Sequence, residues 1–441
     1  MAVTAKFING LKEIGGTFVE IETGAAKCVF DFGYAKGGLL DRDIPLRPEF
    51  AASDLASFGV LPRTDGVYDE SNAKILNVLS YEAFKAQKEC FVLVSHLHID
   101  HMGGLGRLHP EIPVYMTEDS LTLYRRLVEN DDVQGAAHEN CIGVKPGETF
   151  RVGDIEVLPL ETDHDVKGAC GFLIKTQGKT ICYTGDYRFH GFHRELTEAF
   201  VQAAAKETVD LLITESTMVS HGDVDMLSLC APEAGKRTEE NLQQELGDKA
   251  EQSTGLLLVD FYPRNVERVH RLIETMSRQG RKLVLNDMTC DYVHAFYPED
   301  PLYVYAETMA DAQRPAAWNR VTRADILAQP GQYVLQLDHE SLYEALSFRA
   351  VATAFLHFDG PPFGDYDPAY RKMLALLEAC GIPFERLGVS GHAEPYYLRY
   401  LIDTIQPRIL VPLHSFRPEQ VQSNKVGKRI LPEEGEIIRL L

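Results

Sequence analysis

Short apolar runs, each followed by a polar loop, organise the first half of the chain. Residues 17–23 and 27–33 resemble a pair of strands, residues 90–95 a buried strand, and residues 120–130 a helix. Further strands are predicted at 155–162, 170–176 and 179–186. Because these runs end in His or Asp and the loops carry the polar residues, the pattern predicts an α/β sandwich with a site on its rim.

The pattern changes after residue 215. Residues 255–262, 265–280 and 281–287 form a strand–helix–strand sequence of the kind that builds a parallel sheet. Further strands are predicted at 333–338 and 351–358, and a helix at 369–381. From about residue 386 the first pattern returns, with strands that end in histidine. We therefore expect one domain from residues 1–215 and 386–441, interrupted by an inserted α/β domain at 216–385.

The composition is that of an ordinary globular protein of 441 residues, with 45% hydrophobic and 25% charged side chains. No apolar run approaches the roughly 20 residues that a membrane helix needs, and the opening residues lack a signal-peptide pattern. We expect a cytoplasmic protein without a membrane partner. Its eight cysteines are scattered and include no C-x-x-C pair, which favours reduced thiols. A metal site would then use His, Asp and Glu.

The formal net charge of −21 bears on the choice of partner. A strongly acidic chain does not adhere to nucleic acid through a basic surface. Bound cations or a local groove of Lys and Arg could still supply a positive field. The charge therefore weakens the case for a polyanionic substrate without excluding one.

The stretch VLVSHLHIDHMGG, residues 92–104, carries the densest cluster of metal-binding side chains. His96 and His98 are two positions apart after a strand, so they can share a face. Asp100 and His101 follow, where a turn can direct them to a neighbouring point. Imidazoles and a carboxylate suit zinc or a similar divalent ion, and four such groups exceed what one three-ligand site uses.

Three later residues occupy equivalent places at strand ends. His164 follows one strand, Asp186 follows another after Gly185, and His414 closes the strand ILVPL. A carboxylate that reaches two ions, as Asp186 could, offsets charge in a two-metal site. Taken singly, each histidine would more often be structural; together, and in this order, they favour a metal site.

These landmarks resemble the metallo-β-lactamase superfamily, whose pattern is H-x-H-x-D-H, a later His, and GD after a strand. The stretches ITEST, VSGHAE and VPLHSF, with the strand–helix–strand at 255–287, resemble its β-CASP branch, which includes ribonuclease J. The resemblance covers essentially the whole chain. It implies a metallo-β-lactamase αββα sandwich with an inserted α/β β-CASP domain.

The resemblance also implies a ligand set for two divalent metal ions, with zinc first and manganese as an alternative. One ion would take His96, His98, His164 and Asp186, and the other Asp100, His101, Asp186 and His414. Asp31, in VFDFG, matches a buried acid that braces the histidine-rich loop. A strand-end aspartate that caps a turn is an alternative interpretation compatible with this role.

For catalysis, the resemblance implies that Asp100 orients a water molecule or accepts its proton. His392 would contact the scissile phosphate or assist the leaving group, and Glu215 would hold His392. Ser390 and Gly391 are candidates for binding phosphate through backbone N–H groups. In the family, a histidine at the position of His414 is typical of RNA-processing members.

Three functions stay open at this point. The first is a ribonuclease of the β-CASP type. The second is a hydrolase of a small phosphodiester or another ester, which the acidic charge suits, as do Asp338 and Glu340 where ribonuclease J carries a phosphate-binding loop. The third is a non-catalytic nucleic-acid-binding homologue, against which the complete ligand set argues. The oligomeric state is open, with a homodimer as one option.

Overall fold

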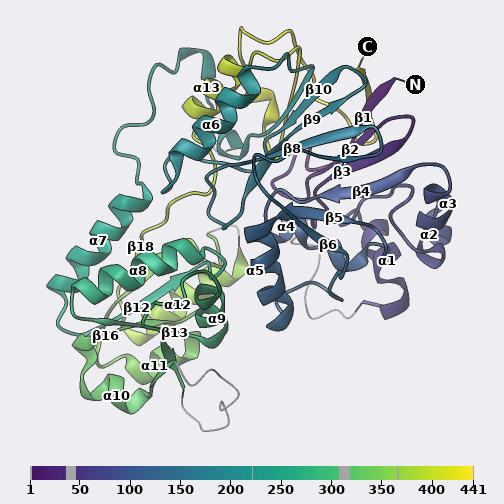
Figure 1. Ribbon diagram of the computed structural model, residues 1–441. Coiled ribbons are helices and arrows are strands. Elements are labelled where there is room, and N and C mark those ends of the chain that lie inside the picture. Colours follow the sequence, from purple (N-terminus) through teal and green to yellow (C-terminus); the bar gives the residue numbers. More distant parts are fainter. Residues whose placement is uncertain (1, 36–45, 221, 307–317, 365–366, 441) are drawn as a thin grey trace. The chain divides into compact units, whose positions relative to one another are not determined.

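The computed structural model describes residues 2–35, 46–220, 222–306, 318–364 and 367–440, and it divides into two compact units (Figure 1). Unit 1 comprises Met1–Phe189, His193–Ala234 and Gly391–Leu441, and unit 2 comprises His190–Phe192 and Gly235–Ser390. Unit 2 is thus inserted between segments of unit 1. The domain boundaries 216 and 385 stay predictions; residues 216–234 group with unit 1 and 386–390 with unit 2.

Unit 1 contains two mixed sheets. In spatial order, one consists of β21 (Ile437–Leu440), β1 (Val3–Asn9), β2 (Phe18–Glu22), β3 (Ala26–Phe30), β4 (Glu89–Leu93), β5 (Val114–Thr117) and β6 (Cys141–Val144). The other consists of β20 (Lys428–Arg429), β19 (Ile409–Leu413), β11 (Leu211–Glu215), β10 (Lys179–Tyr183), β9 (Cys170–Thr176), β8 (Ile155–Glu161) and β7 (Phe150–Val152). Side chains from both sheets form one buried apolar cluster, so the sheets pack face to face.

Helices cover the outer faces of this sandwich (Figure 1). On the side of the second sheet, α6 (Arg194–Ala205) and α13 (Pro395–Ile405) bury residues such as Phe200 and Leu401. On the side of the first sheet, α3 (Tyr81–Lys85) and α5 (Glu118–Glu129) contact its strands. The remaining helices of unit 1 are α1 (Ala51–Ser57), α2 (Glu70–Leu76) and α4 (Ile99–Met102). The predicted αββα sandwich is confirmed.

Unit 2 is built on a parallel sheet. Its spatial order is β15 (Asn319–Val321), β14 (Tyr303–Tyr305), β13 (Lys282–Leu285), β16 (Tyr333–Gln336), β12 (Leu256–Phe261), β17 (Ala352–Phe358) and β18 (Phe384–Arg386). The helices are α7 (Glu239–Gln252), α8 (Val266–Arg278), α9 (Asp287–Phe296), α10 (Arg323–Ala328), α11 (Ala345–Phe348) and α12 (Pro368–Cys380). Strand β12 is buried along its whole length, as expected of a central strand covered on both faces.

Local sequence explains why these elements form. In α8 the buried Val269, Leu272, Ile273 and Met276 recur at helical spacing, and the Asn265 side chain caps the first turn by accepting from the N–H of Arg268. None of the helices in the described ranges is long and apolar enough to cross a bilayer.

Candidate metal centre

The residues of the candidate site follow the ends of neighbouring strands in unit 1. Strands β3 and β4 are parallel, as are β10, β11 and β19, so within each set the carboxyl ends meet at one edge of the sheet. Asp31 follows β3, His96 and His98 follow β4, Asp186 follows β10, and His414 follows β19. The sequence placed these side chains at strand ends, and the sheet order brings the strand ends together.

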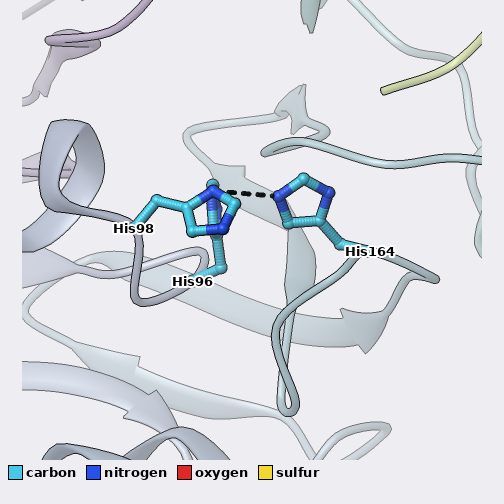
Figure 2. A group of neighbouring side chains, drawn as sticks. All are labelled: His96, His98 and His164. Carbon is cyan, nitrogen blue, oxygen red and sulfur yellow. Dashed lines mark hydrogen bonds between the residues drawn. The ribbon is translucent and has the colours of Figure 1, made fainter. Parts of the chain in front are cut away.

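Three imidazoles converge at one point (Figure 2). His96 Nε2 lies 3.1 Å from His98 Nδ1, which lies 3.3 Å from His164 Nε2. Burial keeps the pKa of His96 and His98 below the ordinary histidine value and lowers that of His164 to about 3. The three rings are therefore neutral at physiological pH, the form in which an imidazole binds a metal.

In His164 and His96, the ring nitrogen that points away from the cluster, Nδ1, already has a hydrogen-bond partner. His164 Nδ1 lies 2.6 Å from the carbonyl oxygen of Gly391, and a carbonyl can only accept, so Nδ1 carries the proton. The Ser95 hydroxyl donates to Asp31, which leaves its oxygen to accept from His96 Nδ1 at 3.1 Å. In both rings Nε2 thus points a lone pair at the cluster. Lone pairs that face one another in this way favour a cation between them.

A second group lies beside the first. His414 Nε2 is 3.0 Å from Asp100 Oδ2 and 3.2 Å from His101 Nε2. Burial opposes ionisation of His101 and His414, but nearby carboxylates, Asp186 foremost, raise the pKa of both imidazoles. Burial alone would raise the pKa of the Asp100 carboxyl. The adjacent imidazoles outweigh burial and hold that pKa well below the ordinary range. The carboxylates thus attract positive charge to this point.

Asp186 lies between the two groups. Its Oδ2 is 3.8 Å from His96 Nε2, 3.4 Å from His101 Nε2 and 3.6 Å from His414 Nε2. This oxygen is buried and accepts no well-aligned hydrogen bond from the described residues. Gly185 explains how the strand end comes so close: its φ is +56°, and a Cβ there would lie 2.7 Å from Ser95 Cβ. A buried acceptor amid imidazole nitrogens fits a shared metal ligand.

Asp31 braces the histidine-rich segment. Its carboxylate accepts from the N–H and hydroxyl of Ser95 at 2.7 and 2.8 Å, from the Tyr183 hydroxyl, and from His101 Nδ1 at 2.8 Å. It is fully buried and has a left-handed backbone, φ 58°. These contacts orient His101 so that Nε2 faces the cluster.

Glu215 and His392 lie at the margin of the cluster. Glu215 accepts from the backbone N–H groups of Thr217 at 2.8 Å and Ala393 at 3.1 Å, which ties it to the residue after His392. Burial and then Asp186 raise the pKa of Glu215 to about 7. His392 Nδ1 is 3.6 Å from Asp186 Oδ2, and its side chain is 20% exposed. Burial lowers the pKa of His392 to about 4.

The predicted phosphate-binding residues have other contacts as well. The carbonyl of Gly391 accepts from His164, as described above, and a Cβ on Gly391 would lie 2.7 Å from both His164 and Asp165. Ser390 belongs to unit 2, where its carbonyl accepts from His190 Nε2 at 2.8 Å. Binding of phosphate by their N–H groups stays a prediction.

Three contributors were not anticipated from the sequence: Ser95, Thr217 and Asp165. The Thr217 hydroxyl is 2.8 Å from His414 Nδ1 and 3.1 Å from the His414 carbonyl oxygen, so it donates to the carbonyl and accepts from the ring. Thr217 lies in ITEST and Asp165 in TDHD, directly beside predicted residues. Adjacency was the only available signal, because the partners of Thr217 lie far along the chain.

Groups of side chains that could hold a metal ion coincide with the predicted ligands. They are His96–His98–His164, His96–His101–Asp186, Asp100–His101–His414 and Asp186–His392–His414. All seven predicted ligands belong to these groups, and His392 joins the last. The donor chemistry, imidazoles and carboxylates, fits a divalent ion such as zinc.

Comparisons with known proteins identify similar chains. A family model described as "Beta-lactamase superfamily domain" matches residues 84–237. Ribonuclease J of Pyrococcus abyssi is 22% identical over 434 residues, which cover 92% of this chain and 88% of that protein. Ribonuclease J2 of Bacillus subtilis is 20% identical, covering 82% of this chain and 66% of its own length. Ribonuclease J of Thermus thermophilus is 23% identical, covering 79% of this chain and 63% of its own length.

A solved structure resembles the whole chain. It is the crystal structure of a protein of unknown function from Enterococcus faecalis V583, with a TM-score of 0.83, 30% identity and 100% coverage of both chains. By contrast, the matched region spans slightly less than two thirds of the Bacillus and Thermus proteins.

Proposed function

Because the chain belongs to the metallo-β-lactamase superfamily, in its ribonuclease J-like β-CASP branch, we propose that it is a metal-dependent phosphodiester hydrolase that cleaves RNA. The observation that carries the proposal is the cluster of neutral imidazoles and buried carboxylates whose lone pairs face one another. The names of the relatives, ribonuclease J and J2, support RNA as the substrate class. His414 also favours RNA, because a histidine at this position is typical of the RNA-processing members of the family.

The residues fit a site for two divalent ions, zinc first and manganese second. His96, His98, His164 and Asp186 would hold one ion, and Asp100, His101, Asp186 and His414 the other. When bound, such ions lower the pKa of a water molecule and offset the negative charge that develops during phosphodiester displacement. Two of the candidate groups, His96–His98–His164 and Asp100–His101–His414, support this division. Asp186 Oδ2 lies 3.8 Å from His96 Nε2 and 3.6 Å from His414 Nε2, which supports a role shared between the two ions.

The protein's own side chains then have distinct tasks. Asp100, a quarter exposed and kept ionised by its neighbours, would orient the attacking water or accept its proton. His392, part-exposed beside Asp186, would contact the phosphate or assist the leaving group. Glu215 would keep His392 in place through the N–H of Ala393. Asp31 would hold the orientation of His101 throughout.

A second candidate is the hydrolysis of a small phosphodiester or another ester at the same site. The net charge of −21 favours it, because a long polyanion meets repulsion that a small substrate largely avoids. Asp338 supports the same interpretation, since it lies at the end of β16 bonded to Asn286 and Ser341, where a phosphate would be repelled.

A substrate panel tests the proposal. The full chain would be assayed with labelled RNA, labelled single-stranded DNA and bis(p-nitrophenyl) phosphate, before and after removal of metal by a chelator and again after addition of zinc or manganese. We expect metal-dependent turnover, with RNA preferred. Turnover of the small diester alone would favour the second candidate, and no turnover of any substrate by fully loaded protein would refute both.

A further inference from the structure

Asp165 is a carboxylate in the centre that the ligand set does not include. It directly follows His164, and its Oδ1 lies 3.3 Å from His98 Nε2 and 3.2 Å from His164 Nε2. The side chain is 16% exposed, while Oδ1 itself is buried. Asp165 is absent from the groups of described residues that could hold an ion directly. Its position is beside the His96–His98–His164 group rather than within it.

The position of Asp165 bears on the tautomer of His98. A neutral imidazole carries its proton on one nitrogen only, and the other nitrogen is the one able to bind a metal. His98 Nδ1 faces His96 Nε2 and His164 Nε2, both of which present lone pairs. His98 Nε2 faces Asp165 Oδ1. An ionised carboxylate can only accept, so it favours the tautomer with the proton on Nε2 and makes Nδ1 the nitrogen that would bind a cation.

The same oxygen adds negative charge next to His164. His164 Nε2 carries no proton, because Nδ1 donates to the Gly391 carbonyl. Two acceptors 3.2 Å apart repel each other unless a positive charge lies nearby. The backbone at Gly391 limits retreat of the carboxylate, since even a Cβ there would lie 2.7 Å from Oδ1. Asp165 is thus held where it strengthens the attraction for a cation.

We propose that Asp165 is a positioning residue for the His96–His98–His164 group: it fixes the tautomer of His98, adds negative charge beside His164, and so tightens the binding of one divalent ion. The inference rests on the proposed metal-dependent function. It concerns the ion of the His96–His98–His164 group, because Asp165 Oδ1 lies 3.3 Å from His98 Nε2 and 3.2 Å from His164 Nε2.

The test is zinc affinity, measured on the full chain by competition with a chromophoric chelator. Wild type would be compared with Asp165→Ala, Asp165→Asn and a control, Glu207→Gln, which removes a surface carboxylate paired with Lys175. We expect Asp165→Ala to lower the affinity for one of the two ions by roughly 10–100-fold, as is usual when a side chain that orients a metal ligand is removed. Asp165→Asn should weaken it less, because the amide oxygen still accepts from His98. The control should bind both ions like wild type.

Two further measurements separate positioning from a general structural role. The urea midpoints of the metal-free proteins should be similar, and the visible spectrum of the cobalt(II)-loaded Asp165→Ala variant should change for one ion only. If Asp165→Ala fails to fold, Asp165→Asn carries the test. Wild-type affinity for both ions in both variants would overturn the inference. Wild type that binds no divalent ion would instead overturn the proposed function.

Discussion

Replacing His414 and His392 in turn separates a metal ligand from a group that acts on the substrate. His414 is 1% exposed, and its Nε2 lies among Asp100, His101 and Asp186. His414→Ala removes that nitrogen and leaves the His96–His98–His164 group intact. The affinity for one ion should therefore fall, and the other ion should stay bound. His392 is 20% exposed and lies at the margin of the cluster, where its Nδ1 is 3.6 Å from Asp186 Oδ2 and 3.7 Å from Glu215 Oε2. His392→Ala should therefore keep both ions.

The expected loss of activity for His392→Ala follows from its role. A positioned acid–base group contributes roughly 10²–10⁴-fold to the rate, which corresponds to about 2.7–5.4 kcal/mol in the activation free energy. Folding should change little, because the side chain is partly exposed. The backbone after His392 remains tied by the hydrogen bond from Ala393 to Glu215.

The assay combines elemental analysis with turnover of RNA and bis(p-nitrophenyl) phosphate. His109→Ala is a matched control, since this histidine pairs with Glu82 and stacks on Tyr81 outside the cluster. Full metal content with full activity on every diester would refute the phosphate-contact role of His392. Loss of an ion from His392→Ala would instead make His392 a ligand, as its presence in the Asp186–His392–His414 group allows.

Two other predictions concern orientation and stability. Thr217→Val removes the hydroxyl that accepts from His414 Nδ1, so it should weaken one ion by roughly 10–100-fold in chelator competition, while Thr217→Ser should not; equal affinities in both variants would contradict the role. In unit 2, burial raises the pKa of Asp260 from its ordinary 3.8 to about 6. The folded state thus holds a proton that the unfolded state has lost, and stability falls as the pH rises from about 4 to 6. Because Asp260→Asn cannot ionise, its unfolding free energy in urea should fall less over that range, by up to about 3 kcal/mol; parallel pH profiles would contradict this.

Much of the fold was predictable because the chemistry lies at element ends. The runs before His96, Asp186 and His414 are β4, β10 and β19, and each residue follows its strand closely. Strand periodicity and the polar residue that ends the run are local signals. The sheet order that brings β4 and β19 near the same cluster is not local, and only the family resemblance supplied it.

The outer contacts of the imidazoles could not be predicted in this way. His164 is oriented by a backbone carbonyl at Gly391, which any residue type could provide. His414 is oriented by Thr217, and His96 by a serine that also bonds to Asp31. Such pairings depend on exact placement between elements distant in sequence. The residue types, Ser and Thr, are common in loops without this role.

The carboxylates in and around the metal centre explain how a strongly acidic protein could attract an anionic substrate. Asp31, Asp100, Asp165 and Asp186 bring negative charge into a buried space, partly offset by protons on His101 and His414. The ligands must lose such protons before a cation binds. Binding of divalent ions therefore changes the local charge through both the added cations and the released protons. A phosphodiester would meet repulsion in the metal-free centre and attraction in the loaded one. Metal occupancy would thus govern substrate binding as well as the chemical step, and the overall charge of −21 is compatible with cleavage of RNA.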